Sequence, residues 1–146
     1  MKTTVLVFVV EDDFLIRQML QDALEDGGYE VATASDGEEA IAMLEAEASD
    51  ARVLLTDVNL SPGKLTGWHV AKRARELKPD VPVIYITGGS GQEWPSRGVP
   101  NSVLLQKPFA PAQAVTAVSQ LLNVAGSSAH AQGSGNARVS VLGGAG

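Results

Sequence analysis

The chain has 146 residues, which is enough for one domain with a sizeable core and too few for two ordinary domains. Its 11 Lys and Arg against 17 Asp and Glu give a net charge of −6, which works against binding to a nucleic-acid backbone or an anionic membrane. It has no cysteine, which excludes disulfides, thiolate metal sites and cysteine nucleophiles. It also lacks a secretory signal pattern and any apolar stretch of the roughly 18 residues that a membrane span needs, so we expect a soluble, cytoplasmic protein.

Short β-branched runs alternate with segments of helical periodicity, which is typical of βαβ units. The predicted strands are residues 4–10, 29–34, 51–56, 82–87 and 102–106. They are apolar and barely alternate, as expected of strands buried on both faces. The sequence therefore predicts an α/β fold, with a parallel sheet and helices on both of its faces.

Four of the connections carry apolar residues at helical spacing. They are marked by Ile16, Leu20, Ala23 and Leu24 before Gly27, by Ala40, Ile41, Leu44 and Ala48 after Asp36, by Val70, Ala74 and Leu77, and by Val115, Val118, Leu121 and Leu122 after Pro111. The remaining connection, 88–98, is rich in Gly and has no apolar stripe, which predicts a short or irregular helix.

The last segment, 124–146, is mostly Gly, Ala and Ser with a single Arg138 and no acidic residue. It offers too little apolar surface to offset the entropy of ordering, so we expect a flexible tail after a domain of residues 1–123. The alternative is a docking tail, for which Val139, Val141 and Leu142 are the only plausible anchors.

Polar residues end four of the five predicted strands. The sequence Glu11-Asp12-Asp13 follows the first strand, Asp57 the third, Thr87 the fourth and Lys107 the fifth. Because ligands bind outside the carboxyl ends of parallel strands, we expect these side chains to meet in one crevice. Clustered carboxylates need a cation or a raised pKa to relieve their repulsion, and oxygen ligands without His or Cys favour Mg²⁺, Mn²⁺ or Ca²⁺ over zinc.

Each of these residues also has an ordinary structural interpretation. The acidic triplet could cap a helix, although capping needs only one residue, for which Asp13 is well placed. Asp57 could begin a turn, Thr87 could be an ordinary strand residue, and Lys107 could be a solvated charge. Taken together, a divalent ion, a lysine and a hydroxyl around a carboxylate indicate phosphoryl transfer to Asp57.

Four motifs resemble those of the receiver domain of bacterial two-component response regulators, in the same order and at similar spacing: Val9-Val10-Glu11-Asp12-Asp13, Leu54-Leu55-Thr56-Asp57, Ile86-Thr87-Gly88 and Lys107-Pro108-Phe109. The resemblance covers about residues 3–123. It implies a doubly wound (βα)₅, flavodoxin-like fold with five parallel strands in the order 2-1-3-4-5. It also implies that the Lys107-Pro108 peptide is cis, a conformation that costs little free energy only when the second residue is proline.

The same resemblance implies the roles of the site residues. Asp57 would accept a phosphoryl group from a sensor histidine kinase or a histidine phosphotransfer protein. Mg²⁺ would be held by Glu11, Asp12, Asp57 and the backbone carbonyl of Asn59, while Thr87 and Lys107 would contact the phosphoryl oxygens. The chain would act as a single-domain switch rather than an enzyme with its own output, signalling by contact with a downstream protein.

Three features depart from the common receiver pattern. The loop from Asp57 to Gly67 is slightly longer than usual. Leu104 stands where the family usually has a Tyr or Phe that moves with the Thr hydroxyl. The weak fourth helix alters the face through which many receivers form homodimers or bind targets, and Trp94 either replaces part of that surface or packs into the core.

Two other functions share parts of this pattern. An aspartate-nucleophile phosphatase of the haloacid dehalogenase type would carry Asp-x-Asp after the first strand and a cap, whereas this strand ends in Glu11-Asp12-Asp13. A flavodoxin-like FMN carrier would need a Ser/Thr/Gly-rich loop at the same place, for its phosphate.

Overall fold

The computed structural model describes residues 5–47, 50–61, 63–89, 91–128 and 140–142. Its strands are β1 (Leu6–Val10), β2 (Glu30–Ala34), β3 (Ala51–Asp57), β4 (Val83–Thr87), β5 (Ser102–Gln106) and β6 (Ser140–Leu142). They form one sheet in the order β2-β1-β3-β4-β5-β6, and every neighbouring pair is parallel. The predicted order 2-1-3-4-5 is confirmed for the first five strands.

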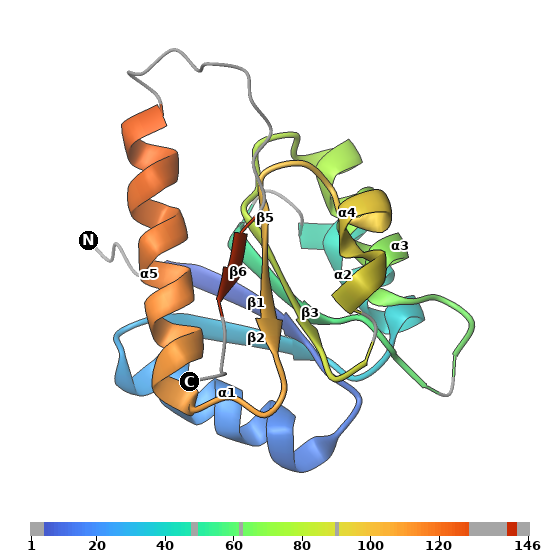
Figure 1. Ribbon diagram of the computed structural model, residues 1–146, viewed down its shortest axis with the longest axis horizontal. Helices are drawn as coiled ribbons and strands as arrows, with labels where there is room; N and C mark the ends of the chain where they lie inside the picture. Colours follow the sequence, from blue (N-terminus) through green and yellow to red (C-terminus); the bar gives the residue numbers. More distant parts are fainter. Residues whose placement is uncertain (1–4, 48–49, 62, 90, 129–139, 143–146) are drawn as a thin grey trace.

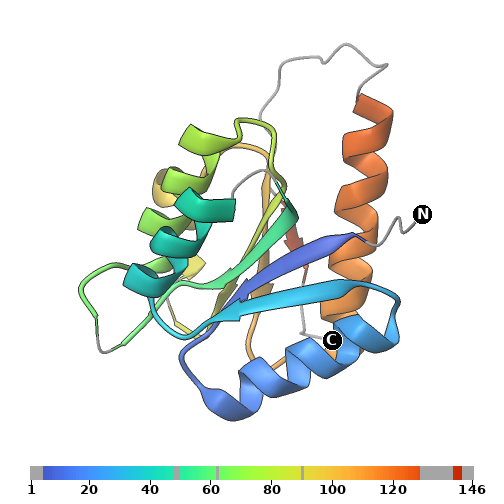
Figure 2. The same ribbon diagram turned by 180° about the vertical axis from the view of Figure 1, so that it is seen from behind.

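The helices form two layers, one on each face of this sheet (Figures 1 and 2). One layer holds α1 (Phe14–Asp26) and α5 (Pro111–Ser128), and the other holds α2 (Gly37–Glu47), α3 (Gly67–Leu77) and α4 (Trp94–Arg97). In the fourth connection, a 3₁₀ turn at Gly91–Glu93 precedes the four-residue α4, so a short helix was correctly expected there. No helix among the described residues is long and apolar enough to cross a membrane.

Two apolar clusters pack between the sheet and these layers. Successive residues of β1 point to opposite faces, so Val7 and Val9 pack with α1 and α5, whereas Phe8 and Val10 pack with α2, α3 and α4. The central strands are buried on both sides, as their continuous apolar runs predict. This rigid sheet fixes the positions of the residues that follow its strands.

Side-chain caps set the starts of three helices. Asp13 accepts a hydrogen bond from the Ile16 amide at 3.0 Å at the start of α1, which confirms its expected capping role. The Asp36 carboxylate accepts one from the Glu39 amide at 2.7 Å, at the start of α2. Thr66 caps α3 in the same way, and the His69 side chain in turn accepts from the Thr66 amide.

The end of the chain differs from the flexible tail expected for 124–146. Helix α5 continues to Ser128, and residues 140–142 form β6 beside β5, with Leu104 opposite Val141 (Figure 1). The physical reason is that β5 is the open edge of a five-stranded sheet, and its unpaired backbone groups can bind even a short strand. Val139, the third anchor of the alternative docking tail, lies outside the described residues.

Candidate functional site

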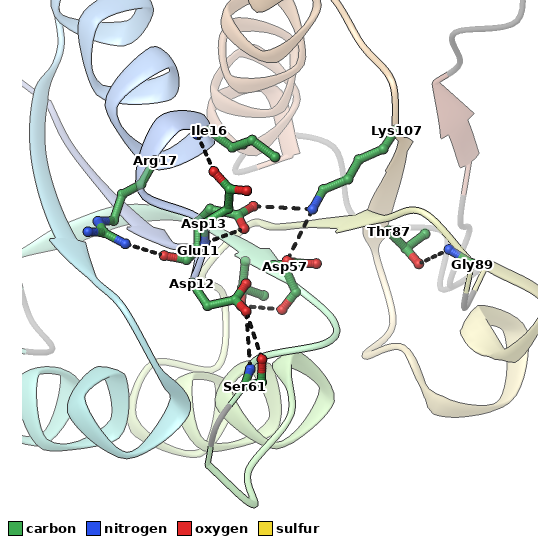
Figure 3. Close-up of polar contacts among 11 residues, drawn as sticks. Glu11, Asp12, Asp13, Ile16, Arg17, Asp57, Ser61, Thr87, Gly89 and Lys107 are labelled. Carbon is green, nitrogen blue, oxygen red and sulfur yellow. Dashed lines mark hydrogen bonds and ion pairs between the residues drawn. The ribbon is translucent and has the colours of Figure 1, made fainter.

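The polar residues that follow β1, β3 and β5 meet at one edge of the sheet (Figure 3). Carboxylate oxygens of Glu11, Asp12 and Asp57 all lie within 4.8 Å of one another. The ammonium of Lys107 lies 3.2 Å from Asp57 Oδ2 and 3.6 Å from Glu11 Oε1. The structure therefore brings together four of the side chains that the sequence pattern singled out, because the carboxyl ends of parallel strands lie at the same edge.

Thr87 and Asn59 are the two remaining site residues that the sequence predicts. Thr87 ends β4, is buried, and its hydroxyl accepts a hydrogen bond from the Gly89 amide at 3.2 Å. In Figure 3 it lies on the Lys107 side of Asp57. Asn59 is exposed, two residues beyond Asp57 at the start of the β3–α3 loop. Their roles toward a phosphoryl group and a metal ion stay predictions.

The pKa values of the two most buried carboxyl groups, those of Glu11 and Asp57, are raised. Burial, together with the charge of Asp57, raises the pKa of Glu11 to about 8. Burial also raises the pKa of Asp57, although the Lys107 ammonium opposes that shift. In the absence of a divalent cation the Glu11–Asp57 pair therefore retains a proton at neutral pH, and the Lys107 ammonium balances the single negative charge that remains on the pair.

Asp12 is in a different environment. Burial alone would raise the pKa of its carboxyl, but hydrogen bonds from the backbone amide and hydroxyl of Ser61 lower it below its usual value. For Lys107, burial would lower the pKa of the ammonium, but the charges of Asp57 and Glu11 raise it, so it stays charged.

The donor set fits a hard divalent cation. Glu11 is fully buried, and its Oε1 atom has no hydrogen-bond partner among the described residues, although a buried carboxylate oxygen normally has one. Its other oxygen accepts from the Asp13 amide at 3.1 Å, which holds the carboxylate in place. Within the described part of the chain, Oε1 forms only the 3.6 Å ion pair with the Lys107 ammonium, so it can still bind a cation. Three carboxylate ligands of this kind suit Mg²⁺ or Mn²⁺, which bind carboxylates and keep several waters.

Backbone contacts that the sequence did not reveal shape the same edge. Arg17 donates to the Glu11 carbonyl at 2.8 Å. Gly67 packs directly on the end of β3, so a Cβ there would overlap the Asp57 carbonyl oxygen, and its amide donates to the Val58 carbonyl at 2.8 Å. In the sequence, the only signal for this close backbone contact is a Gly directly before a helical pattern, and that signal is weak. The Lys107-Pro108 peptide is cis, as expected.

Comparison with known proteins identifies the family. Residues 7–119 match the response regulator receiver domain, and the chain therefore belongs to that family. It is 36% identical over 118 residues to the alkaline phosphatase synthesis transcriptional regulatory protein PhoP of Bacillus subtilis, covering 80% of this chain and 48% of PhoP. It is 31% identical over 118 residues to the response regulator receiver protein CpdR of Brucella abortus, covering 80% of this chain and 95% of CpdR.

A solved structure is similar over the same region. The crystal structure of a response regulator receiver protein from Sinorhizobium medicae has a TM-score of 0.79 and 39% identity, covering 84% of this chain and 97% of that one. The chain thus spans about half the length of PhoP and nearly all of CpdR. Its class of function is phosphorylation-regulated signalling in two-component systems.

Proposed function

We propose that this chain is a phosphorylation-controlled signalling switch in which Asp57 accepts the phosphoryl group. The observation that carries the proposal is the position of the Asp57 carboxylate at the end of β3, 3.2 Å from Lys107 Nζ and grouped with Glu11 and Asp12. A nucleophilic carboxylate beside a fixed cation can attack phosphorus while the charge on the phosphoryl oxygens is neutralised.

The proposed donor is a phosphohistidine on a sensor histidine kinase or on a histidine phosphotransfer protein. An oxygen of Asp57 attacks phosphorus, and the new O–P bond forms as the N–P bond breaks. The leaving imidazole keeps the bonding electrons and takes up a proton. Lys107 pairs with a phosphoryl oxygen, and the Thr87 hydroxyl donates a hydrogen bond to another.

The proposed metal ligands are Glu11, Asp12, Asp57 and the backbone carbonyl of Asn59. Mg²⁺ there would supply positive charge to the phosphoryl oxygens, and Mn²⁺ could replace it. The Oε1 atom of buried Glu11 supports this assignment, because it accepts no hydrogen bond from the described residues and its ion pair with Lys107 is long at 3.6 Å. Release of the proton held by the Glu11–Asp57 pair would accompany metal binding, because a metal ligand must be deprotonated.

The proposed partners are proteins. Phe14 and Leu15 begin α1 directly after the acidic cluster, and their exposed fractions of 61% and 75% are unusual for large apolar residues. They offer a docking contact for the phosphodonor. We propose that output occurs in the cytoplasm through contact with a downstream protein, with a homodimer as a further assembly, and without binding to nucleic acid or membrane.

The test is phosphorylation by a small acyl phosphate in the presence of Mg²⁺, followed by intact mass measurement. The parent should gain the mass of one phosphoryl group, and Asp57→Asn should gain none. Asp22→Asn, which changes an exposed carboxylate on α1, is the matched control and should label like the parent. Equal labelling of Asp57→Asn and the parent would refute the assignment, and steady turnover of a phosphate monoester would favour a phosphatase.

A further inference from the structure

The β3–α3 loop returns to the acidic cluster through Ser61. The Ser61 hydroxyl donates a hydrogen bond to Asp12 Oδ2 at 3.1 Å, and its backbone amide donates to the same oxygen at 3.3 Å (Figure 3). These two residues are 49 positions apart in the sequence. The side chain of Asp12, two residues beyond the end of β1, is therefore held by the loop that follows β3.

A second contact anchors the same loop. The backbone amide of Lys64 donates to Glu38 Oε2, on α2, at 3.2 Å. A Cβ on Gly63 would overlap the carboxylate of Glu38, so the loop backbone lies directly against that side chain. The loop next enters α3 at the Thr66 cap. The loop that carries Ser61 is thus anchored to Glu38 on α2 as well as to Asp12.

These contacts determine how Asp12 is presented to the cluster. A carboxylate oxygen can accept more than one bond, so two donors on Oδ2 leave capacity on the same group for a cation. Hydrogen bonds to a metal-binding carboxylate fix its direction and reduce the freedom that it loses on binding. Asp12 is only partly buried, so without Ser61 its side chain could rotate toward solvent.

We propose that Ser61 is a positioning residue for the divalent metal site. Its hydroxyl holds the Asp12 carboxylate in the direction of Glu11 and Asp57, and thereby strengthens metal binding without contacting the ion. The inference rests on the proposed function, in which Asp12 is a ligand of Mg²⁺. The longer β3–α3 loop then has a specific consequence: it delivers a hydroxyl to the acid that follows β1.

The test is titration of the full chain with Mg²⁺ alone by calorimetry. Ser61→Ala should weaken Mg²⁺ affinity about 3- to 10-fold, below the 10- to 100-fold typical of such groups because the backbone bond remains. Ser61→Thr keeps the hydroxyl and should restore the affinity. Ser96→Ala, which removes an exposed hydroxyl on α4 that donates to the Glu93 carbonyl, should bind like the parent.

Phosphorylation kinetics separate positioning from a general loss of structure. With an acyl phosphate, Ser61→Ala should label at the parent rate at saturating Mg²⁺ and more slowly at limiting Mg²⁺. Unchanged or tighter Mg²⁺ binding by Ser61→Ala would overturn the role of Ser61, as would a slower rate at saturating metal. A parent protein that binds no Mg²⁺ would instead refute the metal site of the proposed function.

Discussion

Leu104 shows how a single residue changes the interior around the site. At this position, where the resemblance implies a Tyr or Phe, Leu104 is buried and pairs in register with Tyr85 on β4. The Tyr85 ring packs on Trp68 with centroids 4.7 Å apart, and its hydroxyl accepts a hydrogen bond from the Val99 amide at 3.0 Å. Tyr85 thus places an aromatic ring beside Leu104, but from β4. Its hydrogen bond with Val99 links it to the segment that precedes β5.

The Trp94 side chain fills the neighbouring part of this interior. It is buried, and its Nε1 donates to Ser102 Oγ at 3.0 Å. Of the two roles considered from the sequence, packing into the core is the one that the structure supports. Its partner Ser102 in turn donates to the Val99 carbonyl at 2.6 Å, so Tyr85 and Trp94 both stabilise the segment around Val99.

Replacing Tyr85 by Phe should destabilise the fold and change its pH dependence. The half-buried Val99 amide would lose its acceptor, at a cost of about 1 kcal/mol at neutral pH. Burial raises the pKa of Tyr85 to about 12 from its ordinary value of 10.0, so the folded state holds this proton more tightly than the unfolded state. The stability that this hydroxyl provides should therefore decrease as pH rises from 10.0 to about 12.

Urea unfolding of the parent and Tyr85→Phe at a series of alkaline pH values measures this effect. The difference in free energy of unfolding between the two proteins should be largest near neutral pH and should shrink above pH 10.0. Comparing the two proteins at each pH removes the contribution of the other groups that titrate there. A difference that stays constant across the series would contradict the assignment.

At the scale of elements, the boundaries of β5 and the presence of a short fourth helix could be predicted, but β6 could not. In residues 102–106 the apolar run Val103-Leu104-Leu105 stands between the polar Ser102 and Gln106, and the Gly-rich stretch 88–98 cannot support a long helix. Ser140–Leu142 is only three residues long and lies in a Gly- and Ala-rich context. These residues form a strand because they pair with the edge of β5. Since β5 is distant in the sequence, the residues around Ser140–Leu142 give no sign of this pairing.

Removing residues 129–146 should uncover the β5 edge. Backbone amides of β5 that β6 protects would then exchange faster with solvent, because an edge strand leaves part of its hydrogen-bonding groups unpaired. Hydrogen exchange with mass spectrometry should show faster exchange in peptides that contain Val103–Leu105 and no change in β1. Deleting only 143–146 keeps β6 and is the control, and equal protection in all three proteins would show that β6 does not cover this edge in solution.

For the whole molecule, the alternation of strands and helices was enough to predict a parallel sheet and the edge at which its polar strand ends meet. Asp57 and Lys107 are 50 residues apart, yet their contact follows from the rule that parallel strands end at one edge. The contacts of Ser61 with Asp12 and of Gly67 with the end of β3 could not be predicted in this way. They depend on how one loop folds across the sheet edge, and a sequence pattern does not specify that path.

Adding Mg²⁺ should stabilise the whole molecule, because a ligand that binds only the folded state shifts the unfolding equilibrium. At about 100 times its dissociation constant the gain is about 2.7 kcal/mol, which corresponds to a rise in melting temperature on the order of 10 °C for a domain of this size. Thermal melts with and without MgCl₂ measure the effect. Because the chain carries a net charge of −6, the metal-free samples need NaCl at matched ionic strength.

Asp12→Asn should lose most of this Mg²⁺-dependent rise, because the substitution removes one of the three clustered carboxylates. Asp36→Asn changes the carboxylate that caps α2, away from the cluster, and should keep the full rise even if its starting melting temperature is lower. An equal rise in Asp12→Asn and the parent would mean that Mg²⁺ stabilises the protein at some place other than the edge formed by β1, β3 and β5. Because the comparison is made within each variant, the cost of either substitution to the metal-free fold cancels.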